Sequence, residues 1–210
     1  MDENTSPTLS DVVPTRAWNA PAAVRLMHRV ESTPVLDRVS SLLGALSSPL
    51  ATEPLRSVLL GAGTGHALHP VLTDVPIGLW TSTTVLDVCG GRRSRPAAQF
   101  LVGAGVLAAV PTALTGLAEW RETRQPESRV GALHASLNVV ALGLYAASFS
   151  LRRRGRHGRG AVAALAGMGI ASCSGYLGGH LTTVRKVGTR DTAYEDDGVG
   201  PALSRPAARP

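Results

Sequence analysis

The sequence contains little charge, few aromatic side chains and a single lysine. Charged residues make up 17% of its 210 residues, below the roughly 25% that is typical of soluble domains. Aromatic residues make up 4%, and Lys186 is the only lysine, so arginine carries almost all of the positive charge behind the net +6. This bias accompanies abundant alanine and glycine, as in proteins encoded by GC-rich genomes. Because no helix-turn-helix, zinc-finger or basic–aromatic pattern accompanies it, it does not indicate nucleic-acid binding.

Cysteines and catalytic motifs are equally sparse. The two cysteines, Cys89 and Cys173, form no CxxC or metal-finger spacing and lie in or beside apolar runs, so they predict small apolar residues rather than a disulfide framework. The N-terminal MDENTSPTLSDVVPTR has no apolar core and does not resemble a secretory signal peptide. No GxSxG, HExxH, phosphate-loop or dinucleotide motif is present, so the sequence predicts no independent catalytic activity.

What the sequence does contain is four long apolar stretches. They run from about 70 to 88, from 97 to 120, from 130 to 151 and from 160 to 181. Each has the length that spans a bilayer core at about 1.5 Å of rise per residue. The links between them are short and charged, as in antiparallel helical hairpins. The sequence therefore predicts an all-α integral membrane bundle of four transmembrane helices, with the lipid bilayer as its first partner.

The remaining segments flank this membrane domain, predicted at residues 63–184. Residues 1–34 lack periodicity and predict a flexible polar tail, and residues 185–210 predict a polar disordered tail. Between 35 and 62, apolar residues recur at near-helical spacing and predict short amphipathic helices that lie on the membrane or pack on the bundle. Those residues are Leu36, Val39, Leu43, Leu46 and Leu50. The basic residues on the two sides of the membrane nearly balance, so the positive-inside rule leaves the orientation open.

An even number of spans gathers most of the histidines at one membrane face. That face receives the starts of the first and third helices and the ends of the second and fourth. The ionisable residues placed there are His66, His69, Asp74, Glu119, His134 and His180. The helical rise puts Asp74 and His134 roughly 6 to 8 Å deeper than His69 and His180. Pro76, inside the first helix, frees the carbonyl of Leu72 and predicts a kink.

Three functions remain open for this polar group. In the first, His69, His134 and His180 supply axial ligands to haem b, or His66, His69, Asp74, His134 and His180 bind a transition metal, in an electron-transfer protein. In the second, Asp74 and His134 belong to a small proton-linked transporter. In the third, the residues only stabilise a structural or assembly subunit.

Small residues recur at every fourth position of two predicted spans. On the fourth helix they are Gly167, Ala171, Gly175 and Gly179, and on the second Ala104, Ala108, Thr112 and Gly116. Such patterns let helix backbones approach closely, within the chain or in a homodimer. Alternatively, these small residues form a smooth helix surface against which a planar cofactor packs.

Three motifs resemble those of the bacterial membrane-protein family catalogued as domain of unknown function 2231. They are Gly65-His66-Ala67-Leu68-His69-Pro70, Pro76-Ile77-Gly78-Leu79-Trp80 and Gly178-Gly179-His180-Leu181. Ala67 replaces the proline usual in the family, and the resemblance covers about residues 36–190. It implies a four-helix protein of the bacterial cytoplasmic membrane. Some relatives carry a Rieske iron–sulfur domain, which implies electron transfer near the histidine face. This chain has no Cys-x-His…Cys-x-x-His pair, so a Rieske-type or other redox protein would be a separate partner.

Overall fold

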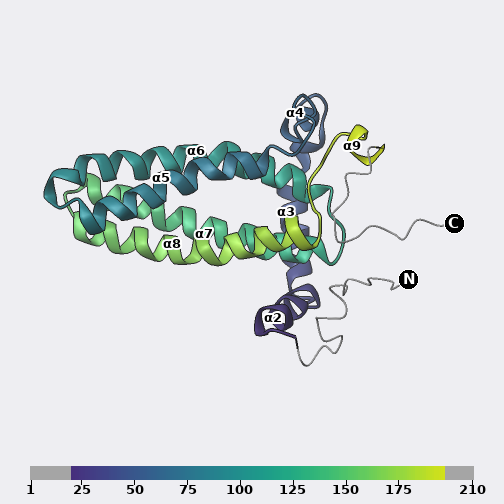
Figure 1. The fold of residues 1–210 in the computed structure, drawn as a ribbon, viewed down its shortest axis with the longest axis horizontal. Helices are drawn as coiled ribbons and strands as arrows, with labels where there is room; N and C mark the ends of the chain where they lie inside the picture. Colours follow the sequence, from purple (N-terminus) through teal and green to yellow (C-terminus); the bar gives the residue numbers. More distant parts are fainter. Residues whose placement is uncertain (1–19, 197–210) are drawn as a thin grey trace, which may run out of the picture.

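The computed structural model describes residues 20–196, and four long helices form its elongated body (Figure 1). They are α5 (His69–Cys89), α6 (Arg95–Arg121), α7 (Glu127–Arg153) and α8 (His157–Gly179), and α8 continues as a π-helix over His180–Val184. They alternate in direction. The short links after α5 and α7 lie at one end of the bundle, here called the arginine end. The opposite end, where α5 and α7 begin, is here called the histidine end.

Three helices of the described part are long and apolar enough to cross a membrane. They cover Arg92–Arg121, Glu127–Arg153 and His157–Val184. Helix α5, the first of the four predicted spans, is not among them, although it runs beside α6 for its whole length (Figure 1). The described residues form no β-strand, only a single bridge between His66 and Arg190. The all-helical class is thus confirmed, with three candidate spans rather than four.

Proline and threonine fix the start of the bundle. Pro70 and Pro96 lie in the first turns of α5 and α6, where a missing N–H costs no hydrogen bond. Pro76 lies inside α5, and the hydroxyl of Thr112 on α6 donates to the carbonyl of Leu72 at 3.1 Å. The backbone group that the proline leaves without an N–H is therefore satisfied by the neighbouring helix.

The packed face of α8 repeats with a period of 3.5 residues, not four. Its small residues that face the bundle are Gly160, Ala164, Gly167, Ala171, Ser174 and Gly178. Of the three glycines in the predicted every-fourth-residue pattern, Gly167 lies against the ring of Tyr145. Gly175 and Gly179 are exposed, and an added Cβ at either position would have no atom within 4 Å. The reason is geometric. A step of four residues turns more than a full circle and drifts off the face, whereas alternate steps of three and four stay on it.

The bundle consists of two hairpins, α5–α6 and α7–α8, each packed more closely within itself than against the other. In each hairpin a large side chain of the first helix lies against a glycine of the second. The pairs are His69 with Gly116, Trp80 with Gly105, His134 with Gly178, Tyr145 with Gly167, and Arg152 with Gly160. An added Cβ would lie 2.3 to 2.7 Å from the partner side chain at Gly105, Gly116 and Gly160, which is too close to fit. At Gly167 and Gly178 it would lie 3.1 Å away, so the partner ring would have to shift slightly.

The two hairpins repeat one another. The interval in sequence from His69 to His134 equals the interval from Trp80 to Tyr145 and that from Asp87 to Arg152. On the second helices, the interval from Thr112 to Ser174 likewise equals that from Gly105 to Gly167 and that from Gly116 to Gly178. Because α5 and α7 run in the same direction, the hairpins are related by a pseudo-two-fold axis along the bundle.

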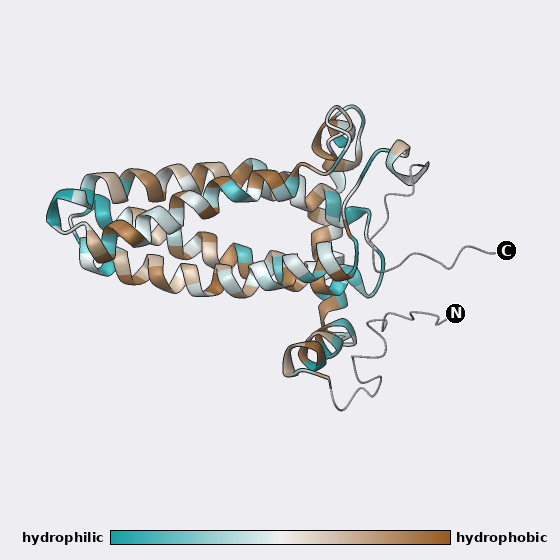
Figure 2. Ribbon diagram, viewed as in Figure 1, coloured by the Kyte–Doolittle hydropathy of each residue, from teal (hydrophilic) through white to brown (hydrophobic). Residues whose placement is uncertain are grey.

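Three residue pairs meet across this axis, each with one member from α5 and one from α7. His69 and His134 form the pair nearest the histidine end. The rings of Trp80 and Tyr145 stack at 3.9 Å with 9° between their planes. Near the arginine end, Arg152 donates to Asp87 at 2.8 Å and is fully buried. The central axis of the bundle therefore contains aromatic and polar pairs, while many large apolar residues of the long helices are exposed, among them Phe100, Leu107 and Val139. Figure 2 shows hydrophobic residues along the four long helices and hydrophilic ones at the turns of the arginine end.

Shorter helices lie across the histidine end: α3 (Leu36–Leu46), a 3-10 turn at Ser48–Ala51 and α4 (Leu55–Leu59) (Figure 1). Arg129 of α7 pairs with Asp37 at 2.7 Å and Arg121 of α6 donates to the carbonyl of Gly44, so polar contacts hold α3 to the bundle. Leu42, Leu46 and Val58 stay at least 60% exposed. This is the amphipathic pattern expected of helices that rest on a membrane surface.

The N-terminal segment differs from its prediction as a flexible tail. Residues Ala22–Glu31 form helix α2, which buries Met27 against Val130, Leu177 and Leu181 of the bundle. Met27 and Val30 pack on the bundle, and the carboxylate of Glu31 is buried. The apolar residues of this segment recur at helical spacing, a signal that the prediction of a flexible tail overlooked. The rest of the predicted N-terminal tail, residues 1–19, and residues 197–210 of the predicted C-terminal tail lie outside the described residues.

Candidate functional site

His69 lies at the first turn of α5 and points at α6. Its Nδ1 lies 2.9 Å from the carbonyl oxygen of Thr112. That carbonyl is one turn from Gly116, whose missing side chain leaves the space that the imidazole ring fills. A backbone carbonyl only accepts, so Nδ1 carries the proton and Nε2 keeps its lone pair.

His134 repeats this arrangement in the second hairpin. Its Nδ1 lies 2.8 Å from the carbonyl oxygen of Ser174 on α8, and Gly178 makes room for the ring one turn further on. The amide nitrogen of Asn138 lies 3.0 Å from Nε2 and donates to it. Both contacts indicate the same tautomer as in His69, with the lone pair on Nε2.

The two imidazoles face one another across the pseudo-two-fold axis. Their ring centroids are 6.3 Å apart and their planes are perpendicular. A hydrogen bond from Nδ1–H to a carbonyl is the usual way in which proteins orient a metal-binding histidine, because it fixes the tautomer and leaves Nε2 for the metal. The structure therefore brings together two of the predicted ligands, His69 and His134.

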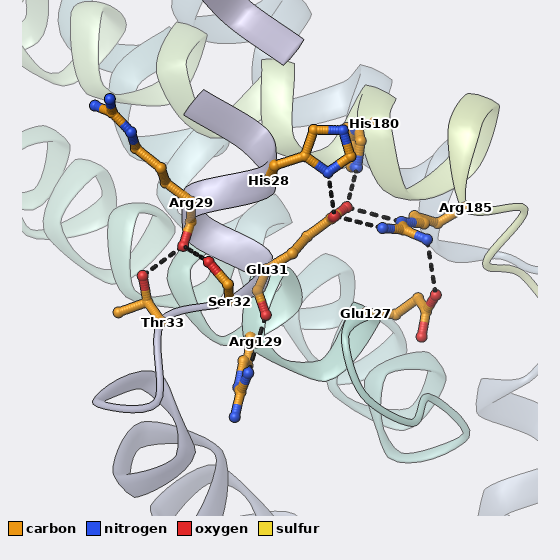
Figure 3. Close-up of polar contacts among 9 residues, drawn as sticks. All are labelled: His28, Arg29, Glu31, Ser32, Thr33, Glu127, Arg129, His180 and Arg185. Atoms are coloured by element: carbon orange, nitrogen blue, oxygen red, sulfur yellow. Dashed lines mark hydrogen bonds and ion pairs between the residues drawn. The ribbon is translucent and has the colours of Figure 1, made fainter. Parts of the chain in front are cut away.

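The other predicted ligands lie elsewhere. His180 lies 2.8 Å from the Glu31 carboxylate of α2, so its ring is engaged outside the axis (Figure 3). His66 is exposed in the loop before α5, with Nδ1 at 3.0 Å from the carbonyl of Ala67. Asp74 is exposed on the outer face of α5 rather than in an inward pocket. Within residues 20–196, no three His, Cys, Asp or Glu side chains are arranged to hold a metal ion.

Glu31 is the centre of a charged cluster that the sequence did not reveal. Its buried carboxylate accepts from His180 and from Arg185 Nε at 2.7 Å, and His28 lies 3.4 Å away (Figure 3). Burial alone would raise the pKa of Glu31, but the hydrogen bonds and charges of Arg185 and His180 outweigh it and hold the pKa below its usual value. The cluster joins α2 to the segment that follows α8.

This lowered pKa predicts a pH dependence for the docking of α2. The stabilisation is present above the usual glutamate pKa of about 4.3 and is lost as the pH falls through the lower folded value. Glu31→Gln mimics protonation at pH 7. We expect amide hydrogen exchange in Ala22–Glu31 to become roughly tenfold faster, since one charge-assisted hydrogen bond contributes about 1.5–3 kcal/mol. Glu53→Gln, at an exposed carboxylate, is the matched control. Equal exchange in both variants would contradict the role of Glu31.

Glu119, the second predicted carboxylate, is buried at the end of α6. It accepts from the backbone N–H of Thr189 at 2.9 Å and from the same residue's hydroxyl. Thr189 also donates to the carbonyl of Leu60. Glu119 therefore ties the segment after α8 across the histidine end, and the backbone there covers the predicted polar group.

Several residues near the histidine pair were missed from the sequence. The backbone carbonyls of Thr112 and Ser174 bind the two histidines. Thr112 was predicted only as a small packing residue, and Ser174 was not predicted at all. The stacked pair Trp80 and Tyr145 is buried, and neither Trp80 Nε1 nor Tyr145 Oη has a hydrogen-bond partner among the described residues. The signal that could have found these residues is the repeat of Gly-Leu-Trp at 78–80 as Gly-Leu-Tyr at 143–145, at equal distances from the two histidines.

Comparison with known proteins places the bundle in one family. The sequence model described as "Predicted membrane protein (DUF2231)" matches residues 65–191, which cover all four long helices and both histidines of the pair. No curated protein and no solved structure matches the chain.

Proposed function

Since this match covers more than half of its residues, the chain belongs to the DUF2231 family of predicted membrane proteins, and we propose that it is a haem-binding electron-transfer protein. In this proposal α5–α8 all span the bacterial cytoplasmic membrane. His69 and His134 bind the haem iron from opposite hairpins. The observation that carries the proposal is the symmetric pair of imidazoles on the bundle axis, each fixed through Nδ1.

The proposal treats α5 as the fourth span. Its 21 residues rise roughly 31 Å, which matches the hydrocarbon core of a bilayer. Part of its lower hydropathy comes from residues that face the bundle, such as Thr83 and Asp87, and these do not contact lipid. As the repeat counterpart of α7, α5 takes the equivalent position in the membrane.

The donor set fits haem better than a bare metal ion. Haem iron takes two axial ligands from the protein, and imidazole is a usual one. A bare transition-metal ion needs more protein ligands, and the described residues bring no third His, Cys, Asp or Glu to the pair. His69 and His134, whose ring centroids lie 6.3 Å apart, would be the two residues that hold the iron.

Within this chain, the residues of the pair have distinct tasks. The carbonyls of Thr112 and Ser174 hold the Nδ1 protons and orient the rings. Asn138 must release Nε2 of His134 for the iron to bind there. The two hairpins pack less closely against each other than each packs within itself, so a flat group would be accommodated between them. Bound haem supplies a one-electron centre near the histidine end, and a Rieske-type or other redox protein would exchange electrons with it there.

An absorption spectrum of the detergent-purified full chain from haem-replete cells tests the proposal. We expect a Soret band, with sharp low-spin bands after reduction by dithionite. His69→Ala and His134→Ala should each abolish the sharp low-spin bands, because these bands would require imidazole ligands from both hairpins. His66→Ala and His180→Ala are the matched controls and should retain them.

A featureless spectrum of the folded wild-type protein, without metal by elemental analysis, would overturn the proposal. The histidine pair would then serve only to join the hairpins. If His180→Ala removed the chromophore and His134→Ala did not, the ligand pair would be wrong although haem was bound.

A further inference from the structure

The arginine end of the bundle carries a dense and unbalanced positive charge. Eight arginines lie in the links after α5 and α7 and the adjoining helix ends, and all but Arg152 are exposed. The exposed ones are Arg92, Arg93, Arg95, Arg153, Arg154, Arg156 and Arg159. Asp87 is the only carboxylate in these segments, and it is held by the buried Arg152. The exposed arginines therefore have no acidic partner at this end within the described part of the chain.

The histidine end differs, although it carries a similar number of basic residues. There Arg56 pairs with Glu53 and Glu122, Arg129 with Asp37, and Arg185 with Glu31. Three arginines of that end are therefore paired with carboxylates of the chain, whereas the exposed arginines of the arginine end are not.

A shallow hollow of about 540 Å³ opens among these arginines. Its lining joins the start of α6 to the link before α8, through Arg95, Gly155, Arg156, His157, Gly158 and Arg159. Gly155 and Gly158 contribute no side chains, so the space between the arginines stays free. Nδ1 of His157 is buried and has no partner among the described residues. The hollow thus offers guanidinium donors to one ligand, and no carboxylate lines it.

We propose that this hollow binds the phosphate of an anionic phospholipid headgroup. Guanidinium groups match phosphate oxygens in geometry and charge. The hollow lies at the end of membrane-spanning helices, at the level where headgroups are found. Anionic headgroups attract basic residues that lie close to the membrane surface. This inference concerns the other end of the bundle and does not depend on haem.

Native mass spectrometry of the full chain in detergent, titrated with phosphatidylglycerol or phosphatidylcholine, tests the proposal. We expect tighter binding of phosphatidylglycerol. The double variant Arg156→Gln/Arg159→Gln should weaken it about 25-fold, since each arginine near a lipid surface contributes about fivefold. The control, Arg92→Gln/Arg93→Gln, removes the same charge from exposed positions outside the hollow, and its loss of binding should be clearly smaller than that of the first double variant.

Three results would overturn the proposal. Equal affinity for the two lipids would show that the headgroup charge is not recognised. Equal losses in the two double variants would show diffuse attraction instead of a site. Displacement of phosphatidylglycerol by millimolar inorganic phosphate would identify a site for soluble phosphate rather than for lipid.

Discussion

Asp87→Asn is expected to destabilise the bundle by about 3–5 kcal/mol, the range for removing one partner of a buried ion pair. The Arg152 guanidinium is fully buried between the hairpins, where it donates to Asp87 and to Ser148 Oγ at 3.1 Å. Asparagine can accept one of these hydrogen bonds but leaves the positive charge uncompensated. The measurement is the unfolding midpoint and free energy of the purified protein in mixed micelles.

Two further variants separate the ion pair from a general loss of packing. Arg153→Gln removes an exposed neighbour of equal charge and should change the free energy of unfolding by less than about 1 kcal/mol. The double replacement Asp87→Leu/Arg152→Leu removes both charges and should recover most of the stability, because a buried ion pair is often replaceable by apolar residues. A single variant Asp87→Asn that unfolds like the wild type would contradict the role of this pair.

The long helices were predictable because their lengths and composition are set by the membrane. The predicted stretches begin at about 70, 97, 130 and 160, and the helices begin at His69, Arg95, Glu127 and His157. The predicted stretches are a few residues shorter than the helices at their charged ends. Arginine and glutamate lower the average hydropathy there, although they continue the helix. Helix α5 is not a candidate span because polar residues interrupt it, among them Asp74 on its outer face and Thr83 and Asp87 toward the bundle.

The histidine pair was predictable only in part. Up-and-down topology puts His69 and His134 at the same end, and their spacing in the repeat puts them on the same axis. His180 also lies at that end, but its ring is held by Glu31 of α2. The helical spacing of apolar residues in α2 could have predicted the helix, but the contact between Glu31 and His180 depends on where that helix packs, which the sequence alone does not give.

The residues on the packed face of α8 could be predicted only with the correct helical period. Steps of four on the fourth helix led to Gly175 and Gly179, which are exposed. Alternating steps of three and four lead to Ser174 and Gly178, which contact His134. The exposed glycines remain available for contact with a second copy of the chain, which is the homodimer expected from the small-residue pattern.

Gly116→Val is expected to abolish binding of haem through both histidines, although neither histidine is replaced. A Cβ at position 116 would lie 2.6 Å from Cε1 and 2.7 Å from Nδ1 of His69. The backbone of α6 cannot retreat without disturbing its contact with α5, so the imidazole must leave the carbonyl of Thr112. Only His134 would then be placed to hold the iron. The expected result is a loss of the sharp low-spin bands, as for His69→Ala.

A matched variant shows whether this loss comes from the position of the ring. Gly78 has nothing within 4 Å of an added Cβ, so Gly78→Val adds the same bulk to the outer face of α5 and should retain the chromophore. Gly178→Val, whose Cβ would lie 3.1 Å from the ring of His134, should give an intermediate loss because a smaller shift relieves the contact. Since the two glycines are equivalent in the repeat, a folded Gly116→Val protein with the wild-type spectrum would mean that the histidines bind haem in another arrangement or not at all.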